Sequence, residues 1–103
     1  MDSTRQNKIS RLVQKELSEI FQREIRDIVM GTMVTVTSVK VTPDLAIAKS
    51  YLSIFPGENK AEVFKSIKGA GSQIRFLLGQ KVGKQLRVIP ELQFYIDDSL
   101  DYL

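Results

Sequence analysis

The chain contains no cysteine and no histidine among its 103 residues. Without cysteine there can be no disulfide framework and no thiolate metal site, which is consistent with a reducing cytoplasm. Without histidine the commonest general base is missing. The chain also lacks a long uncharged apolar run, and its first eight residues are polar rather than signal-like. We therefore expect a soluble, cytoplasmic protein that is not exported and does not associate with a membrane.

Positive charge is concentrated in one part of the chain. The formal net charge is +3, but residues 60–90 carry seven Lys or Arg against Glu62 alone, whereas residues 91–103 carry four acids and no base. Such asymmetry favours an anionic partner, without saying whether it is RNA, DNA or a membrane. The length allows one hydrophobic core. We expect a single domain over residues 1–103, with a short polar N-terminus and an acidic C-terminal tail.

Hydrophobic periodicity predicts a long first helix. From Ile9 to Val29 apolar residues recur at spacings of three and four, which gathers them on one helix face. The helix is expected to begin with Ser3 or Thr4 as its cap and to end at Gly31.

A β-hairpin is predicted next. Residues 33–41 are rich in β-branched side chains, and their alternation changes phase near Thr37-Ser38, which indicates a bulge. Residues 46–55 are strand-like as well, and Thr42-Pro43-Asp44 is turn chemistry, so the two strands should pair antiparallel.

The second half of the chain predicts two helices and a strand. Residues 59–84 have a helical pattern that Gly69-Ala70-Gly71-Ser72 interrupts. Each glycine costs a helix about 1 kcal/mol relative to alanine, so we expect a kink between two shorter helices. Residues 86–89 and 92–96 are predicted to form a third strand, with an edge or bulge at Pro90 because proline lacks a ladder donor. The order of elements predicts an α+β domain with a three-stranded sheet packed against helices.

Several stretches resemble the bacterial ribosome-binding factor A family: Ile74-Arg75-x-Leu77-Leu78-Gly79, then Leu86-Arg87-x-x-Pro90-Glu91-Leu92-x-Phe94, and the hairpin from Val34-Thr35-Val36 to Asp44-Leu45-Ala46-x-Ala48-Lys49. The matches occur in the family's order and run from about Ile9 to Leu100. The resemblance implies a type II KH-like fold that binds the small ribosomal subunit and its precursor rRNA, supporting late maturation and rRNA processing, above all in the cold. We expect a monomer without a cofactor.

The predicted kink is a candidate backbone-binding element. KH domains clamp nucleic-acid backbone with a GxxG loop between two helices, and the resembled family has an Ala-x-Gly kink instead. Here Ala70 is present, but Ser72 stands at the glycine position and the glycine is Gly71. A helix that restarts there could hold a phosphate on its free N–H groups, with Ser72 and Gln73 assisting. Alternatively, the glycines only let two helices pack closely.

Nine basic residues are the candidate RNA contacts. Lys8, Arg11 and Lys15, with Arg26 beside them, lie opposite Val13 and Leu17 on a helical wheel. By itself that stripe is more typical of a solvated helix face. The remaining six surround the kink and the start of the third strand, with a density of charge typical of RNA binders: Lys65, Lys68, Arg75, Lys81, Lys84 and Arg87. We predict RNA contact there, with the first stripe as a second contact.

The aromatic residues are not assigned to RNA. Phe76 lies away from the apolar helix face and could stack on a base, but we predict that it packs on a neighbouring element. Four others are assigned to the core or to the sheet surface: Tyr51, Phe55, Phe94 and Tyr95.

We predict no metal site and no catalysis. Asp97, Asp98 and Asp101 could bind a divalent ion, but a flexible acidic terminus is the better interpretation. The sequence contains no P-loop, nucleophile–base pair or zinc-ligand spacing.

Two other functions remain open. One is a general KH-like module for single-stranded nucleic acid without ribosomal specificity. The other is a protein-interaction adaptor that uses the sheet's free edge, which would leave the basic clusters without a role. Salt separates these classes, because phosphate contacts weaken steeply with salt and an apolar interface does not.

Overall fold

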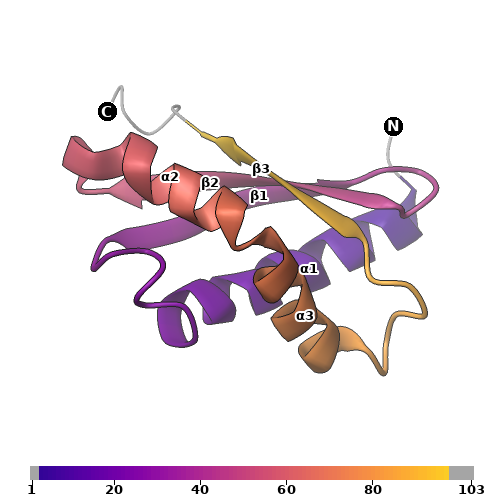
Figure 1. Cartoon of the computed structure of the whole chain (residues 1–103). Coiled ribbons are helices and arrows are strands. Elements are labelled where there is room, and N and C mark those ends of the chain that lie inside the picture. The colour runs from indigo at the N-terminus through magenta and orange to yellow at the C-terminus, as the bar shows by residue number, and fades with distance from the viewer. Residues whose placement is uncertain (1–2, 98–103) are drawn as a thin grey trace.

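The computed structural model describes residues 3–97. Its elements are α1 (Thr4–Arg23), β1 (Met33–Val41), β2 (Ile47–Phe55), the short 3-10 helix η1 (Gly57–Asn59), α2 (Lys60–Gly69), α3 (Gly71–Val82) and β3 (Glu91–Ile96). One sheet has the order β1-β2-β3, with β1 antiparallel and β3 parallel to β2. The helices lie against one side of it and leave the other side open (Figure 1). The predicted α+β architecture is confirmed.

Helix α1 begins where the sequence predicts but ends earlier. Ser3 caps it in a capping box: the Ser3 side chain accepts the Gln6 backbone N–H, and the Gln6 side chain accepts the Ser3 N–H. The predicted end at Gly31 is wrong, because the helix stops at Arg23. The apolar spacing continues to Val29 since the turns over residues 24–31 also bury Ile25 and Val29 in the core. Gly31 instead serves the turn into β1, with a φ of +77°.

The hairpin and its bulge are confirmed. The register of β1 against β2 shifts between Val36 and Ser38, so Thr37 is the extra residue. The Thr37 hydroxyl donates to Asp97 Oδ2 at 2.6 Å, which ties the bulge to the end of β3. Because of the bulge, valines before and after it all face the core.

The break between α2 and α3 is also confirmed. Ala70 separates the two helices with φ −95° and ψ 13°. Its N–H bonds back to the carbonyls of Ser66 and Ile67, and its carbonyl accepts the Ile74 N–H of α3. One residue therefore ends one helix and begins the next.

The third strand is shorter than predicted. β3 covers Glu91–Ile96, and residues 86–89 belong instead to an irregular loop over residues 83–90. The Arg75 guanidinium accounts for the difference. It donates to the Ile89 carbonyl at 2.6 Å and to the Pro90 carbonyl at 3.2 Å, so these carbonyls bond to α3 rather than to β2.

Polar side chains of α1 occupy the outer edge of β1. Gln6 donates to the Val41 carbonyl, Ser10 accepts the Val41 N–H, and Gln14 donates to the carbonyls of Val36 and Thr37. Unpaired strand edges invite association with other strands. The edge of β1 is thus bonded within the molecule, and β3 forms the other edge of the sheet.

These edge bonds predict a stability effect for Gln6→Ala. The change leaves the Ser3 N–H and the buried Val41 carbonyl without their partner, so the free energy of unfolding should fall by about 2 kcal/mol in urea titrations. Gln22→Ala, on an exposed position of the same helix, is the control and should change it by less than about 0.5 kcal/mol. Equal losses in the two variants would contradict the role given to Gln6.

Candidate nucleic-acid interface

A polar hollow lies where α2 meets α3, beside the start of β3. This junction groove has a volume of about 470 Å³ and is lined by Lys68, Gly69, Gly71, Ser72, Arg75, Glu91 and Leu92. Lys68 comes from the last turn of α2 and Arg75 from α3, so the break between the helices brings two cations to one site. One carboxylate, Glu91, shares the groove.

The start of α3 adds backbone donors to the junction groove. The first bond inside α3 runs from the Ile74 N–H to Ala70, and no side chain among the described residues caps the helix. The first turn of α3, with its N–H groups and the positive end of the helix dipole, therefore lies at the hollow, which Gly71 and Ser72 line. A phosphate group matches both the donors and the neighbouring cations.

The two glycines of the break do not serve close helix packing. A Cβ at Gly69 or Gly71 would meet no atom within 4 Å, and neither glycine has a positive φ. The alternative that they only allow tight helix packing therefore lacks support. What the missing side chains leave open is direct access to the backbone.

Lys65 and Lys68 lie together on α2, and both are exposed. The Lys68 ammonium is 5.4 Å from the centre of the Phe64 ring, a cation–π contact that steadies the side chain at the groove. Arg75 is exposed too, although two of its donors hold loop 83–90. The arginine thus both shapes the groove and contributes charge to it.

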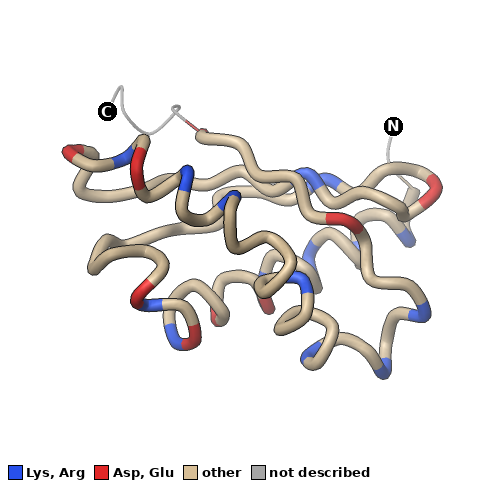
Figure 2. Tube along the Cα trace, viewed as in Figure 1, with Lys and Arg blue, Asp and Glu red and all other residues tan. Residues whose placement is uncertain are grey.

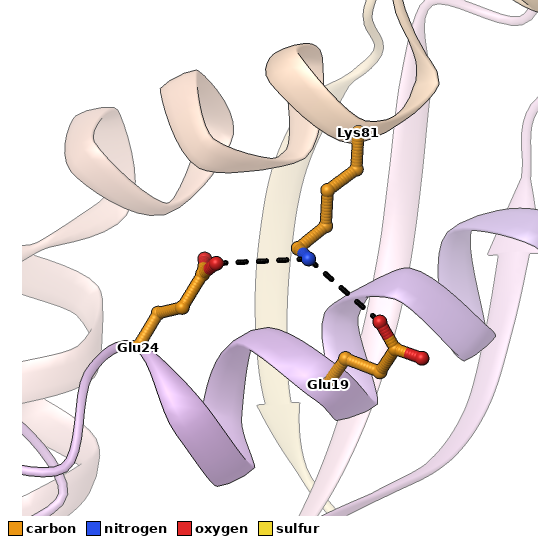
Figure 3. A network of polar contacts seen from close by, with 3 residues as sticks. All are labelled: Glu19, Glu24 and Lys81. Atoms are coloured by element: carbon orange, nitrogen blue, oxygen red, sulfur yellow. Dashed lines mark ion pairs between the residues drawn. The ribbon is translucent and has the colours of Figure 1, made fainter.

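Lys81 differs from the other predicted contacts because carboxylates surround it. Its ammonium lies 3.7 Å from Glu19 and 3.6 Å from Glu24, which both come from the end of α1 (Figure 3). The three side chains together carry a net charge of −1. Lys81 therefore links α3 to α1 and adds little positive potential to the surface.

A second hollow lies at the far end of the molecule. This far-end groove, of about 660 Å³, is formed by the start of α1, the turn of the hairpin and loop 83–90, and its charged residues are Arg5, Lys8, Asp44 and Arg87. The structure thus places Lys8 and Arg87 in one groove, although the sequence analysis assigned them to separate groups. Arg5 was missed, because one more cation at a helix start has no distinctive spacing.

Asp44 is the acidic residue that lines the far-end groove. The Thr42 hydroxyl donates to its carboxylate at 2.7 Å, and the Ala46 N–H donates at 3.1 Å. These hydrogen bonds, the Thr42 one first, hold the pKa of the Asp44 carboxyl below its usual value. Asp44 is therefore a permanent anion near neutral pH, and it offsets part of the positive charge there.

The other predicted contacts are Arg11, Lys15 and Lys84, which are all exposed. Arg11 and Lys15 follow Lys8 along α1, and Lys84 lies near the start of loop 83–90. Figure 2 shows basic residues along the helices and the loop and also on the sheet. The nine predicted contacts are therefore spread over several sites, with one of them, Lys81, engaged by acids.

Phe76 does not pack as predicted. Its side chain is 65% exposed, because it projects from α3 on the side away from the buried Ile74 and Leu78. It lines a shallow hollow with Ser72 and Arg75, next to the junction groove. Phe94 is buried and Tyr51 half-buried, as assigned, while Phe55 is 70% exposed at the end of β2.

Within residues 3–97, no three His, Cys, Asp or Glu side chains are grouped so that they could hold a metal ion. Asp98 and Asp101 of the acidic tail lie outside the described residues. No helix among the described residues combines the length and the apolar character needed to cross a membrane.

Known proteins resemble this chain over nearly its whole length. The family model for ribosome-binding factor A matches residues 5–103. Ribosome-binding factor A of Flavobacterium psychrophilum is 46% identical, covering 100% of this chain and 80% of its own. That of Cytophaga hutchinsonii is 44% identical, covering 99% and 77%.

Solved structures show the same fold. The crystal structure of ribosome-binding factor A from Thermus thermophilus has a TM-score of 0.72 at 19% identity, covering 88% of this chain and 94% of its own. A Thermus thermophilus homology model, fitted into a cryo-EM map of a 30S complex with that factor, has a TM-score of 0.67 at 21% identity, with 84% and 89% covered. The predicted KH-like fold is confirmed.

The two hydrogen bonds of Arg75 predict that Arg75→Lys will loosen loop 83–90. A lysine ammonium cannot reproduce the planar fork that reaches two successive carbonyls. Amide exchange across residues 86–89 should accelerate at least fivefold, while the core of α1 exchanges as before. Arg87→Lys is the matched control, and a loop that exchanges equally fast in both variants would refute the anchoring role.

Proposed function

We propose that this chain, which belongs to the ribosome-binding factor A family, binds the small ribosomal subunit through its precursor rRNA and supports late subunit maturation. The family match, over residues 5–103, makes it a ribosome-binding factor. That a Thermus relative has been fitted into a map of a 30S complex supports the small subunit as the target. The place of action is then the cytoplasm.

The junction groove is the observation that carries this proposal. Lys68, Arg75 and the first turn of α3 give positive charge and hydrogen-bond donors to one open site of about 470 Å³. Phosphate oxygens are the ligand that this combination fits best. Phe76, exposed beside it, is available to stack on a base.

The basic residues divide into two proposed contacts. Lys65, Lys68 and Arg75 meet the backbone of one RNA segment at the junction groove. A second segment meets the far-end groove, where Arg5, Lys8 and Arg87 lie together. The exposed side chains of Arg11 and Lys15, further along α1, and of Lys84 on loop 83–90 extend this contact. Lys81 stays with Glu19 and Glu24, and its role is to hold α3 on α1.

The mechanism is binding without catalysis. The chain holds one conformation of the rRNA by its charge and shape until processing is complete, and then leaves. Incorrect base pairing dissociates more slowly at low temperature, so the need for such a factor is greatest in the cold. The protein acts as a monomer, with no cofactor.

A general module for single-stranded nucleic acid is the alternative. The same groove serves it, because phosphate contacts carry no sequence information. The two functions differ in their preference for small subunits over unrelated single strands of equal length.

Sedimentation in sucrose gradients tests the ribosomal target. At low salt the protein should migrate with free small subunits, and raised salt should release it, because each phosphate contact adds a salt-dependent term. The double variant Lys65→Gln/Lys68→Gln should lose at least tenfold in affinity for purified subunits. Arg23→Gln, which removes an exposed charge that does not line the junction groove, is the control.

Protein that stays at the top of the gradient at both salts, yet binds unrelated RNA strands, would favour the general module. Retention of the double variant on the subunits as firmly as Arg23→Gln would rule out the junction groove as the contact.

Gly71→Leu tests backbone access. Because a Cβ at Gly71 meets no atom within 4 Å, the variant should melt within about 2 °C of the wild type. Its side chain stands where the RNA backbone approaches the first turn of α3, so affinity for small subunits should fall at least fivefold. Gly71→Ala adds the smallest side chain, and its affinity for small subunits should lie between those of the wild type and Gly71→Leu. Equal losses in the melting and binding assays would contradict this reading.

A further inference from the structure

The open side of the sheet carries two lysines directly opposite each other. Lys40 of β1 and Lys49 of β2 are register partners, and Gln93 of β3 follows Lys49 in the same row. Their chain neighbours Val39, Val41 and Ala48 are buried, so both lysines point away from the helices, and both are exposed. Within residues 3–97, neither lysine forms an ion pair.

This cross-strand pair opposes folding. Like charges at directly opposite positions of an antiparallel pair repel each other and lower stability. An anion bound between the two ammonium groups turns that repulsion into two attractions. The pair therefore suits a ligand that carries negative charge at the sheet surface.

An aromatic pair lies in the next row of the same face. Tyr51 and Tyr95 are register partners, and their rings stack with centres 5.3 Å apart at 26°. The Tyr95 hydroxyl donates to the Gln93 side-chain oxygen at 2.8 Å, which restrains the ring, and Tyr95 is 40% exposed. Because β3 is the edge of the sheet, no strand among residues 3–97 covers the Tyr95 ring on the side away from Tyr51.

The two rows are two residues apart along β2, which is about 7 Å. One nucleotide can bridge that spacing, with its base on an aromatic ring and its phosphate near a lysine. Stacking on exposed aromatic rings combined with charge neutralisation of the backbone is how sheet surfaces hold single-stranded nucleic acid.

The aromatic row is continuous with the junction groove. A smaller hollow of about 270 Å³ runs along the edge of β3 and is lined by Lys68, Gly71, Leu92, Gln93, Phe94 and Tyr95. Lys68 and Gly71 belong to the junction groove as well. A strand held there can therefore pass over β3 to Tyr95 and reach Lys49 without leaving the surface.

We propose that the open side of the sheet is a further binding site for single-stranded RNA, in which Tyr95 stacks on a base and Lys40 and Lys49 hold a phosphate. This site goes beyond the contacts proposed above and lies on the other side of the sheet. It rests on the proposed RNA binding, but its residues are distinct from those of the junction groove.

Fluorescence anisotropy with a labelled single-stranded RNA octamer tests this site, read beside thermal melting. Lys49→Gln should weaken binding about threefold and reduce the slope of log affinity against log salt by about 0.7, as expected for one lost phosphate contact. The same variant should melt about 2 °C higher, because the repulsion of Lys40 is gone. If Lys49 had only a structural role, replacing it would not weaken RNA binding and raise the melting temperature at the same time. Arg23→Gln, with an equal loss of charge elsewhere, is the control.

Tyr95→Leu tests the stacking. The variant should lose about fivefold in affinity for the octamer and bind an abasic octamer as the wild type does, whereas Tyr95→Phe should retain wild-type binding of both. Phe55→Leu removes another exposed aromatic ring from the far end of β2 and should change neither affinity.

Three results would overturn the sheet site. The first is wild-type binding by Lys49→Gln and Tyr95→Leu while Lys65→Gln/Lys68→Gln loses affinity, which leaves the junction groove intact and removes the sheet site alone. The second is a Lys49→Gln effect no larger than that of Arg23→Gln. The third is an octamer that fails to bind the wild type at low salt, which would contradict RNA binding at the junction groove as well as at the sheet.

Discussion

The packing of α1 across the sheet is the interaction on which the rest of the structure depends. Val13, Leu17 and Ile20 are completely buried in the core under the sheet. Along the margin of the same helix, Gln6, Ser10 and Gln14 bond the outer edge of β1. Apolar burial and edge bonding therefore act from one element. Within the sheet itself, they leave the edge of β3 and the open face accessible to other molecules.

The fold also places the basic residues in different electrostatic surroundings. Basic residues that lie near each other in the sequence reach different environments, because α2 and α3 break at Ala70 while α3 packs on α1. Lys68 and Arg75 meet at an open groove, whereas Lys81 meets two carboxylates. Local charge density alone could not separate these cases, since the partners of Lys81 come from a helix about sixty residues away in the chain.

Prediction from the sequence succeeded where the signal was local. A cap at Ser3 or Thr4, a bulge near Thr37-Ser38 and a break within residues 69–72 each follow from a few neighbouring residues. The structure has all three, at Ser3, Thr37 and Ala70. Element ends that depend on distant partners were wrong. Residues 86–89 have strand propensity, but the Arg75 guanidinium bonds the carbonyls of Ile89 and of Pro90 after it. The turns after Arg23 keep a helical spacing of apolar residues without forming a helix.

The candidate site shows the same limit. The kink and its cations were visible in the sequence, but the bonded edge of β1 was not, although Gln6, Ser10 and Gln14 recur at a spacing of four. Phe76 was assigned to packing because aromatic side chains usually pack against another element, yet its side chain is exposed and no element among the described residues covers it. The Lys40–Lys49 pair depends on the register of two strands, which the bulge sets and which sequence alone left open.

Hydrogen–deuterium exchange of the chain on purified small ribosomal subunits tests the central claim most directly, because the proposed contact is made by backbone N–H groups. The amides of Gly71, Ser72 and Gln73, at a helix start without a capping side chain, should exchange at least tenfold more slowly in the bound chain than in the free chain. Protection should extend into β3 and should disappear at raised salt. If the first turn of α3 exchanged equally fast in the free and bound chain while other segments became protected, the subunit would contact another surface and the proposed interface would be wrong.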